Sequence, residues 1–362
     1  MGQEIQVGLG RRSYPIVIQA GMLAAVGRDL AGRAIAKRYL VVADDQVARL
    51  HGASLLASLA SGGLTADLLT FPAGEASKSL ATVGQLASQL AQRGTDRRDG
   101  LIALGGGVTG DITGFLAAVY MRGIPFVQVP TTLLAQVDSS VGGKTGVDIP
   151  EGKNLVGAFY QPRAVYIDTR VLATLPAAEL LNGLAEVVKY GVIRDAALFA
   201  SLEEQQAAIL ARDLPVLERV IARCCQIKAE VVAADETEAD LRRILNFGHT
   251  IGHAVEASSG YALAHGLAVA MGMAAAADIA VAKGMLASAE RDRLERLLAG
   301  FGLPVRLPAG LDRQAVQGFL RTDKKAVAGR PFFVLPRAIG EVEITGAVDE
   351  ALVAAVLAGR AG

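Results

Sequence analysis

The chain has 362 residues, 52% of them hydrophobic, and its 36 Lys and Arg residues balance 36 Asp and Glu residues. This length predicts two domains, and the zero net charge argues against a nucleic-acid partner, which would require a basic excess or stripe. The two cysteines are adjacent and cannot form a disulfide framework, so we expect buried thiols in a reducing cytoplasm.

The N-terminal half alternates between strand and helix patterns. Residues 1–18 contain no apolar run behind a basic start, which argues against a signal peptide. Leucine and valine at helical spacing predict a helix over 80–94. Short apolar runs predict buried strands at 39–44, 66–74, 100–107, 124–132 and 164–169. This alternation is typical of a parallel α/β sheet.

Helical patterns replace the strands after about residue 170. They cover 177–193, the segment of Leu214 to Asp235, the histidine-rich segment and the Ala-rich run from Leu267. The Ala-rich run contains Asp278 and is shorter than the roughly 18–20 apolar residues of a membrane span, so a buried core helix is expected. The predicted domains are therefore 1–170, with an α/β sheet, and 171–362, made of helices.

A glycine turn follows the strand at 100–107. Gly105, Gly107 and Gly110 fit the pattern G-x-G-x-x-G between a strand and a helix, where glycine lets a pyrophosphate approach the backbone. The pattern alone is weak, and the acidic residue expected about 20 residues later is missing. Asp44 could hold a ribose instead. Glu75 and Lys78 are further candidates, unless they belong to a solvated loop.

Residues 131–154 are rich in Gly, Lys, Thr and Asn. A Walker phosphate loop is excluded because Asp138 stands where its first glycine is required. Lys144 and Lys153 each follow a glycine, which a polar surface loop would not require. We therefore expect this segment to bind an anion.

Three of the four histidines lie within 17 residues. His249 and His253 share a helix face, Glu256 follows at i+7, and His265 lies nearby. Imidazole and carboxylate are ligands of zinc, and a catalytic zinc site has three protein ligands. The spacing therefore predicts a divalent metal site, with Glu256 or Glu186 as the carboxylate ligand.

Polar residues on apolar helices give further candidates. Asn182, Glu186 and Lys189 form one narrow stripe on the helix at 177–193. Buried lone charges are costly, so the stripe either lines a metal cavity or contains a buried Glu–Lys ion pair. Lys228 lies on the apolar face of its own helix, where it either reaches solvent or points into a site.

Three blocks of sequence resemble the dehydroquinate synthase family of sugar-phosphate cyclases. They are the run from Gly105 to Pro162, NGLAEVVKYG and ILNFGHTIGHAVEA, and the resemblance extends from about Asp44 to Lys325. It implies a Rossmann-like NAD-binding domain over 1–170, an all-α metal- and substrate-binding domain over 171–362, a site in the cleft between them, and a homodimer.

The resemblance also implies roles for individual residues. The metal ligands would be Glu186, His249 and His265, holding zinc or, alternatively, cobalt, whereas His253 would act on the substrate. The residues implied for NAD are Asp44, Glu75, Lys78, Gly105, Gly106, Gly107, Val108, Asp111, Thr131, Thr132, Lys153 and Thr174. Those implied for catalysis, besides His253, are Arg122, Asp138, Lys144, Asn154 and Lys189. Those implied for substrate binding are Lys228, Arg242, Asn246 and either Lys324 or Lys325.

The implied reaction converts a phosphorylated sugar acid, 3-deoxy-D-arabino-heptulosonate 7-phosphate, to 3-dehydroquinate and phosphate. NAD oxidises C5 transiently, phosphate is eliminated, the hydride returns, and the ring opens and closes by an intramolecular aldol reaction. Three alternatives compete: a polyol dehydrogenase, a cyclase for a sugar phosphate without a carboxylate, and a non-enzymatic nucleotide-binding protein. The lysine-rich segment argues against the first, Arg242, Asn246 and His253 together argue against the second, and the metal cluster argues against the third.

Overall fold

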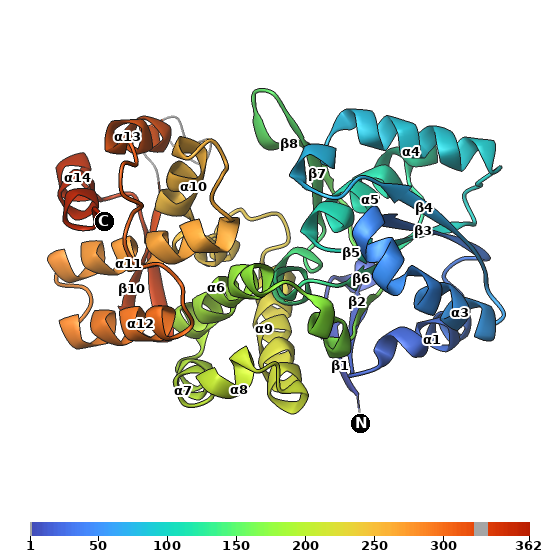
Figure 1. The fold of residues 1–362 in the computed structure, drawn as a ribbon, viewed down its shortest axis with the longest axis horizontal. Coiled ribbons are helices and arrows are strands. Elements are labelled where there is room, and N and C mark those ends of the chain that lie inside the picture. The colour runs from blue at the N-terminus through green and yellow to red at the C-terminus, as the bar shows by residue number, and fades with distance from the viewer. Residues whose placement is uncertain (1, 322–331) are drawn as a thin grey trace. The chain divides into compact units, whose positions relative to one another are not determined.

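The computed structural model describes residues 2–321 and 332–362, and the chain divides into two compact units (Figure 1). Unit 1 comprises Met1–Pro176 and Leu214–Thr237, and unit 2 comprises Ala177–Asp213 and Glu238–Gly362. The predicted boundary at residue 170 lies six residues before the first crossing. Leu214–Thr237, which the sequence placed in the helical domain, belongs instead to unit 1.

Unit 1 contains a seven-stranded sheet in the order β1-β2-β9-β6-β5-β3-β4. Within this sheet β1 and β2 pair antiparallel, and every other pair is parallel. β7 and β8 form a separate antiparallel hairpin. The five strands predicted from apolar runs are all present, as β3, β4, β5, β6 and β9. The strands of unit 1 are β1 (Gln3–Val7), β2 (Tyr14–Ile18), β3 (Arg38–Asp44), β4 (Thr65–Phe71), β5 (Gly100–Gly105), β6 (Phe126–Pro130), β7 (Lys144–Ile149), β8 (Gly152–Phe159) and β9 (Val165–Ile167).

Helices cover both faces of this sheet. Alternate residues of β3 point to opposite faces, so Val41 packs with α1 and α3, whereas Leu40 and Val42 pack with α4 and α5. The helices of unit 1 are α1 (Val26–Arg33), α2 (Asp45–Val47), α3 (Ala53–Ser61), α4 (Leu80–Gln92), α5 (Gly107–Val119) and α9 (Leu214–Ala234). Its shorter helical turns are η1 (Gly10–Arg12), η2 (Met22–Ala24), η3 (Ala48–Gly52), η4 (Glu75–Ser77), η5 (Tyr120–Arg122), η6 (Ala135–Ser139) and η7 (Thr169–Thr174).

Helix α9 belongs to unit 1 because of the surface that it covers. It contacts β1, β2, η6 and η7, and its apolar residues Leu217, Ile221 and Cys224 are fully buried. A helical period in the sequence shows that a helix has an apolar face, but it does not show which neighbour will cover that face.

Unit 2 is mainly helical and also contains the antiparallel hairpin β10–β11, which an all-α domain does not include. Its helices are α6 (Ala177–Arg194), α7 (Ala196–Glu204), α8 (Gln206–Leu210), η8 (Leu241–Asn246), α10 (His249–Ser258), α11 (His265–Ala282), α12 (Ser288–Gly300), α13 (Arg313–Arg321) and α14 (Glu350–Gly359), and its strands are β10 (Phe333–Ala338) and β11 (Glu341–Thr345). Among the described residues only α11 is long and apolar enough to span a membrane. Of its residues 72% are buried, and it contacts α6, α10 and α12, as expected of a core helix.

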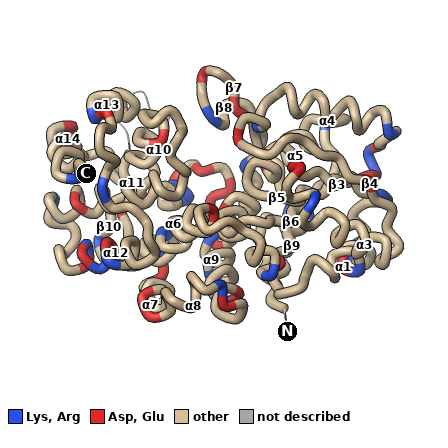
Figure 2. Tube along the Cα trace, viewed as in Figure 1, with Lys and Arg blue, Asp and Glu red and all other residues tan. Residues whose placement is uncertain are grey.

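Charges of both signs occur in each unit (Figure 2). Helix α12, for example, carries Glu290 and Glu295 together with Arg291 and Arg293. This mixture agrees with the balanced composition of the whole chain.

Candidate active site

The carboxyl ends of the unit 1 strands form one candidate half-site. β3 pairs with β4 on one side and with β5 on the other, so the strand order reverses between β3 and β5. In open α/β sheets, ligands bind outside the carboxyl ends of the strands at this point. Asp44 ends β3 and Gly105 ends β5. Asp44 also caps α2, because its Oδ1 accepts hydrogen bonds from Gln46 N at 3.0 Å and Val47 N at 2.9 Å.

The glycine turn after β5 leads directly into α5. A Cβ atom on Gly105 would overlap the side chain of Thr109, and one on Gly106 would lie 3.0 Å from Thr132 Cγ2. The glycines therefore let the turn fit against the protein's own side chains. Gly106 is the N-cap of α5 and offers no side chain to its first-turn N–H groups, which are suited to an anion.

Ion pairs lie beside this turn. Lys78 Nζ is 2.5 Å from Asp111 Oδ2, and Lys153 Nζ is 3.3 Å from Glu75 Oε1. Lys78 is buried, so it does not belong to a solvated loop. Burial by itself would lower the pKa of Lys78, but attraction to Asp111, Glu75 and Asp148 outweighs that effect and raises the pKa above its usual value.

The segment expected to be an anion-binding loop is largely regular structure. It forms the π-helical turn η6 and the hairpin β7–β8, with Lys144 at the start of β7 and Asn154 in β8. Asn154 has a φ of +53°, and its N–H donates to Asp148 Oδ1 at 2.7 Å. The buried hydroxyl of Thr131 has no hydrogen-bond partner among the residues that the structure describes, which suits a bound ligand.

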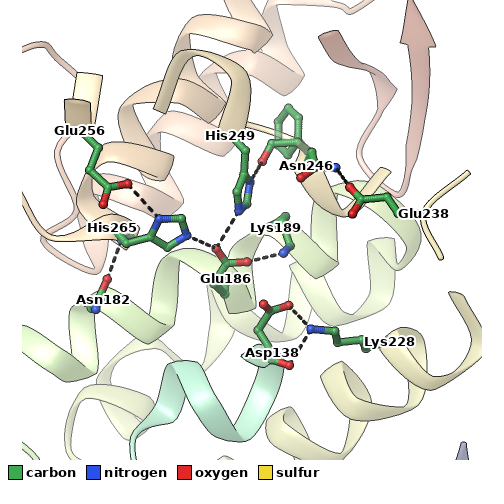
Figure 3. A network of polar contacts seen from close by, with 12 residues as sticks. Asp138, Asn182, Glu186, Lys189, Lys228, Glu238, Asn246, His249, Glu256 and His265 are labelled. Carbon is green, nitrogen blue, oxygen red and sulfur yellow. Dashed lines mark hydrogen bonds and ion pairs between the residues drawn. The ribbon is translucent and has the colours of Figure 1, made fainter. Parts of the chain in front are cut away.

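Lys228 does not reach solvent. Its ammonium group is buried and donates to the backbone oxygen of Asp138 at 2.6 Å and to Asp138 Oδ1 at 2.8 Å (Figure 3). Helix α9 thus places the buried cation Lys228 against η6 in unit 1.

Glu186 and Lys189 in α6 are the most buried charges among the described residues of unit 2. Each side chain is 1% exposed, and Lys189 Nζ forms an ion pair with Glu186 Oε2. Glu186 also faces the histidines (Figure 3). The buried Glu–Lys ion pair of the polar stripe is therefore present, and the second carboxylate oxygen of Glu186 faces the imidazoles.

His249 and His265 converge on the same oxygen of Glu186. Glu186 Oε1 lies 3.4 Å from His249 Nε2 and 3.5 Å from His265 Nε2. Two ligand atoms of a tetrahedral zinc ion, each about 2.1 Å from the metal, lie about 3.4 Å apart. His249 Nδ1 is 3.1 Å from Phe247 O, which leaves Nε2 for a metal. Glu186, His249 and His265 could therefore hold a divalent ion. His249, His253 and His265 form a second possible set, because their ligand atoms all lie within 4.8 Å of one another.

Glu256 contacts His265 from its other side, with Oε2 at 3.3 Å from Nδ1. Burial alone would lower the pKa of His265, but hydrogen bonds and attraction to Glu186 and Glu256 raise it to about 9 in the metal-free protein. A metal ion would therefore displace a proton on binding. Asn182 Oδ1 accepts from Gly266 N at 2.5 Å, which ties the start of α11 to α6.

The remaining predicted residues are placed as follows. Asn246 ends η8, and its side-chain amide donates to Glu238 Oε1 at 2.5 Å. Glu238 was not predicted, because it lies in an irregular segment without periodicity. Arg242 is buried in unit 2, and Arg122 is exposed at the end of η5 with a φ of +65°. Thr174 Oγ1 is 3.1 Å from His51 Nε2 in unit 1. Lys324 and Lys325 lie outside the described residues.

Comparisons with known proteins identify the family. Residues 68–182 match the 3-dehydroquinate synthase N-terminal family, and residues 183–326 match the 3-dehydroquinate synthase C-terminal family. A curated 3-dehydroquinate synthase of Desulforamulus reducens is 50% identical over 98% of this chain and 99% of its own length. That of Symbiobacterium thermophilum is 52% identical over 93% of this chain and 95% of its own. The chain belongs to the 3-dehydroquinate synthase family.

Solved structures of sugar-phosphate cyclases have the same fold. A 2-epi-5-epi-valiolone synthase of Streptomyces hygroscopicus with NAD⁺ and Zn²⁺ bound is 33% identical, with a TM-score of 0.89 over 97% of this chain and 98% of that chain. A 2-deoxy-scyllo-inosose synthase with carbaglucose-6-phosphate, NAD⁺ and Co²⁺ is 28% identical, with a TM-score of 0.89 over 98% of this chain and 99% of that chain.

Proposed function

We propose that this protein is a 3-dehydroquinate synthase, an enzyme of the shikimate pathway that converts 3-deoxy-D-arabino-heptulosonate 7-phosphate to 3-dehydroquinate and phosphate. Near-full-length similarity to curated enzymes of that name supports the reaction. The single structural observation that carries the proposal is the convergence of His249 and His265 on Glu186 at distances suited to a divalent metal.

The proposed reaction requires two bound groups, NAD⁺ and a divalent metal ion. When bound, the nicotinamide of NAD⁺ supplies a reversible hydride acceptor for C5 of the substrate, and the divalent metal, zinc or cobalt, supplies a Lewis acid for the C5 oxygen. Glu186, His249 and His265 would hold the metal. The residues that would hold NAD⁺ are Asp44, Glu75, Lys78, Gly105, Gly106, Gly107, Val108, Asp111, Thr131, Thr132, Lys153 and Thr174. The uncapped start of α5 and the buried hydroxyl of Thr131 support this assignment.

Side chains of unit 2 would orient the reacting hydroxyls. Lys189 neutralises one oxygen of Glu186 and keeps the other directed at the histidines. His253, one helical turn from His249, would transfer the proton of the C5 hydroxyl. Asn246, fixed by Glu238, would donate a hydrogen bond to the substrate.

Cations would hold the two anionic groups of the substrate. Lys144, Arg122 and Asn154 would contact the phosphate. The phosphate would accept the proton at C6 and leave with the electron pair of its bond to C7, so that a C6–C7 double bond forms. Arg242 and Lys228 would contact the carboxylate, for which a guanidinium is suited by its two parallel N–H donors. Asp138 holds the Lys228 ammonium group in place and preserves its charge.

The remaining assignments follow from this reaction. Release of phosphate by elimination makes the enzyme a carbon–oxygen lyase. We expect a soluble, cytoplasmic homodimer, and light scattering of the purified protein tests the dimer.

One assay tests the reaction. We expect holoenzyme with heptulosonate phosphate and substoichiometric NAD⁺ to release one phosphate per substrate without net NADH. A chelator should abolish phosphate release, and zinc or cobalt should restore it. NADH that accumulates one for one with substrate would identify a dehydrogenase and overturn the proposal.

The second candidate is a cyclase for a sugar phosphate without a carboxylate. The 2-epi-5-epi-valiolone synthase structure, at 33% identity, favours it, although the curated 3-dehydroquinate synthases are about 50% identical. The same phosphate assay with a heptulose phosphate that lacks the carboxylate discriminates them. We expect no turnover of that substrate.

A further inference from the structure

Glu256 is a buried carboxylate for which the reaction above gives no role. It is 5% exposed and lies in the last two turns of α10, one face of which also carries His249 and His253. Its Oε2 lies 3.3 Å from Nδ1 of His265, the first residue of α11 (Figure 3). A buried carboxylate is costly unless a partner compensates it, and here that partner is a histidine that could bind the metal.

The contact fixes which nitrogen of His265 faces the metal position. Nδ1 meets Glu256, and Nε2 lies 3.5 Å from Glu186 Oε1. With Nδ1–H donating to Glu256, the lone pair of Nε2 is directed at the position between Glu186 and His249. A carboxylate behind an imidazole fixes its tautomer and ring orientation and increases its basicity as a ligand.

The two histidines are oriented by different groups. His249 Nδ1 contacts the backbone oxygen of Phe247, whereas His265 Nδ1 contacts the charged side chain of Glu256. A carbonyl and a carboxylate both fix the orientation of an imidazole ring. Only the carboxylate also adds a negative charge near the position of the metal ion. The group behind His265 is a side chain, so its effect on metal affinity can be tested by substituting Glu256.

We propose that Glu256 is a positioning residue for the metal ion rather than one of its ligands. It holds His265 through Nδ1 and, through that charged hydrogen bond, tightens metal binding. This inference deepens the metal site and rests on the proposed function. It also explains why Glu256 and His249 occupy one face of α10, since that face provides both a ligand and the support for another.

Metal affinity, measured by competition with a coloured chelator, tests the role of Glu256. We expect Glu256→Ala to weaken zinc and cobalt binding about 10–100-fold. Glu256→Gln keeps an acceptor oxygen without the charge and should give an intermediate loss. The visible absorption band of bound Co²⁺ should keep the intensity of the wild-type site in Glu256→Gln, because the ligand set is unchanged.

A matched control separates positioning from general destabilisation. Glu295→Gln removes a carboxylate of unit 2 that pairs with Arg360 and contacts none of the histidines. Thermal unfolding of each metal-free variant reports its stability. We expect Glu295→Gln to bind metal with wild-type affinity even where its unfolding temperature is lowered as much as that of Glu256→Ala.

Three results would overturn the inference. Wild-type affinity in Glu256→Ala would show that His265 needs no support. Equal losses of affinity in Glu295→Gln and Glu256→Ala would show that stability alone is responsible. Collapse of the Co²⁺ band in Glu256→Gln would make Glu256 a ligand. Failure of the wild-type protein to bind any divalent ion is a separate outcome, because it removes the metal site of the proposed function itself.

Discussion

Glu186 and Lys189 show how far individual residues of unit 2 depart from what stability alone would favour. Both side chains are almost completely buried and form an ion pair within one helix. Removing two charges from water costs several kcal/mol for each ion, so an apolar pair of similar volume is often at least as stable. Such a pair therefore indicates a role for its charges, and the imidazoles beside Glu186 indicate metal binding.

Substitution of His253 tests its assignment to the substrate. We expect His253→Ala to bind zinc with unchanged stoichiometry and to lose about 10²–10⁴-fold in turnover, the range for removal of a general acid or base. His249→Ala is the matched variant on the same helix, and it should lose the metal. Metal analysis of both purified variants, together with phosphate release, provides the measurement. Loss of bound metal from His253→Ala would instead make His253 a ligand.

The spacing of the histidines indicated a possible metal site but did not assign roles within it. The spacing of His249, His253 and Glu256 made all three equal candidates on one helix face. The roles proposed for the histidines depend on which ring atoms face Glu186. For His249 two factors matter: Nδ1 contacts the backbone oxygen of Phe247, and Nε2 faces Glu186 of the separate helix α6. Neither factor has a signature in the spacing of residues.

Close packing of α10 against α11 is the element-scale feature that brings the histidines together. A Cβ atom on Gly272 of α11 would overlap the backbone oxygen of Gly248, and one on Gly252 of α10 would lie 3.0 Å from Ala268 O. Gly248, at a φ of +79°, starts α10 one residue before His249. Glycine at these positions lets the two backbones approach closely, so the separation of His249 from His265 depends on glycines outside the proposed ligand set.

Gly272→Ala should therefore impair the metal site from a distance. The added methyl group forces α11 away from α10, which we expect to cost about 1–3 kcal/mol of unfolding free energy, as in overpacked cores, and to weaken metal binding. Gly84→Ala is the control, because a Cβ at that position in α4 meets no atom within 4 Å. It should stabilise the protein by about 0.4–1 kcal/mol. Denaturant unfolding and chelator competition measure the unfolding free energy and the metal affinity of both variants. Equal changes in Gly272→Ala and Gly84→Ala would contradict this expectation.

The predicted elements were those with strong local patterns. Apolar runs identified the buried parallel strands, and helical spacing identified α4, α6, α9, α10 and α11. The hairpins β1–β2, β7–β8 and β10–β11 were not predicted. Each contains one strand that is largely exposed or half-buried, namely β1, β8 and β11, and such a strand has no continuous apolar run. The segment of β7–β8 contains so many glycines and polar residues that its composition indicated a loop. Pairing between strands, which defines these hairpins, is not a local property of either strand.

At the scale of the whole molecule, the chain crosses between the units three times, after Pro176, Asp213 and Thr237. Helix α9 lies between the last two crossings and adds Lys228 to unit 1, although its neighbours in sequence belong to unit 2. The division of the sequence into two successive halves is therefore only approximate. Composition changes near residue 170, but composition does not reveal that the later segment Leu214–Thr237 packs in unit 1.

Cys225 provides a probe of the packing of α9 against η6 in unit 1. Its thiol donates to Gln136 O at 3.2 Å, and burial raises its pKa from 9.0 to about 12. Between about pH 9 and about pH 12, unfolded chains lose a proton that the folded protein keeps, so the free energy of unfolding should fall as pH rises. Cys225→Ala should reduce this slope in urea unfolding experiments across the same range.

The thiol should also be unreactive toward iodoacetamide in the native protein at neutral pH and reactive after unfolding, because the thiolate is the nucleophile. The same pH dependence of stability in the wild-type protein and in Cys225→Ala would contradict the burial of α9 against η6. Rapid labelling of Cys225 in the native protein would contradict it as well.

The threading of the chain has a consequence for biosynthesis. Unit 1 receives its last helix only when residue 237 has been translated, which at about 5–20 residues per second is about 3–12 seconds after residue 176. During that interval the nascent sheet exposes the apolar surface on β1 and η6 that α9 later covers. The ribosome therefore synthesises α6, with Glu186, before the first unit is complete. The N-terminal half can complete its packing only after α9, which is encoded well beyond it, has been made.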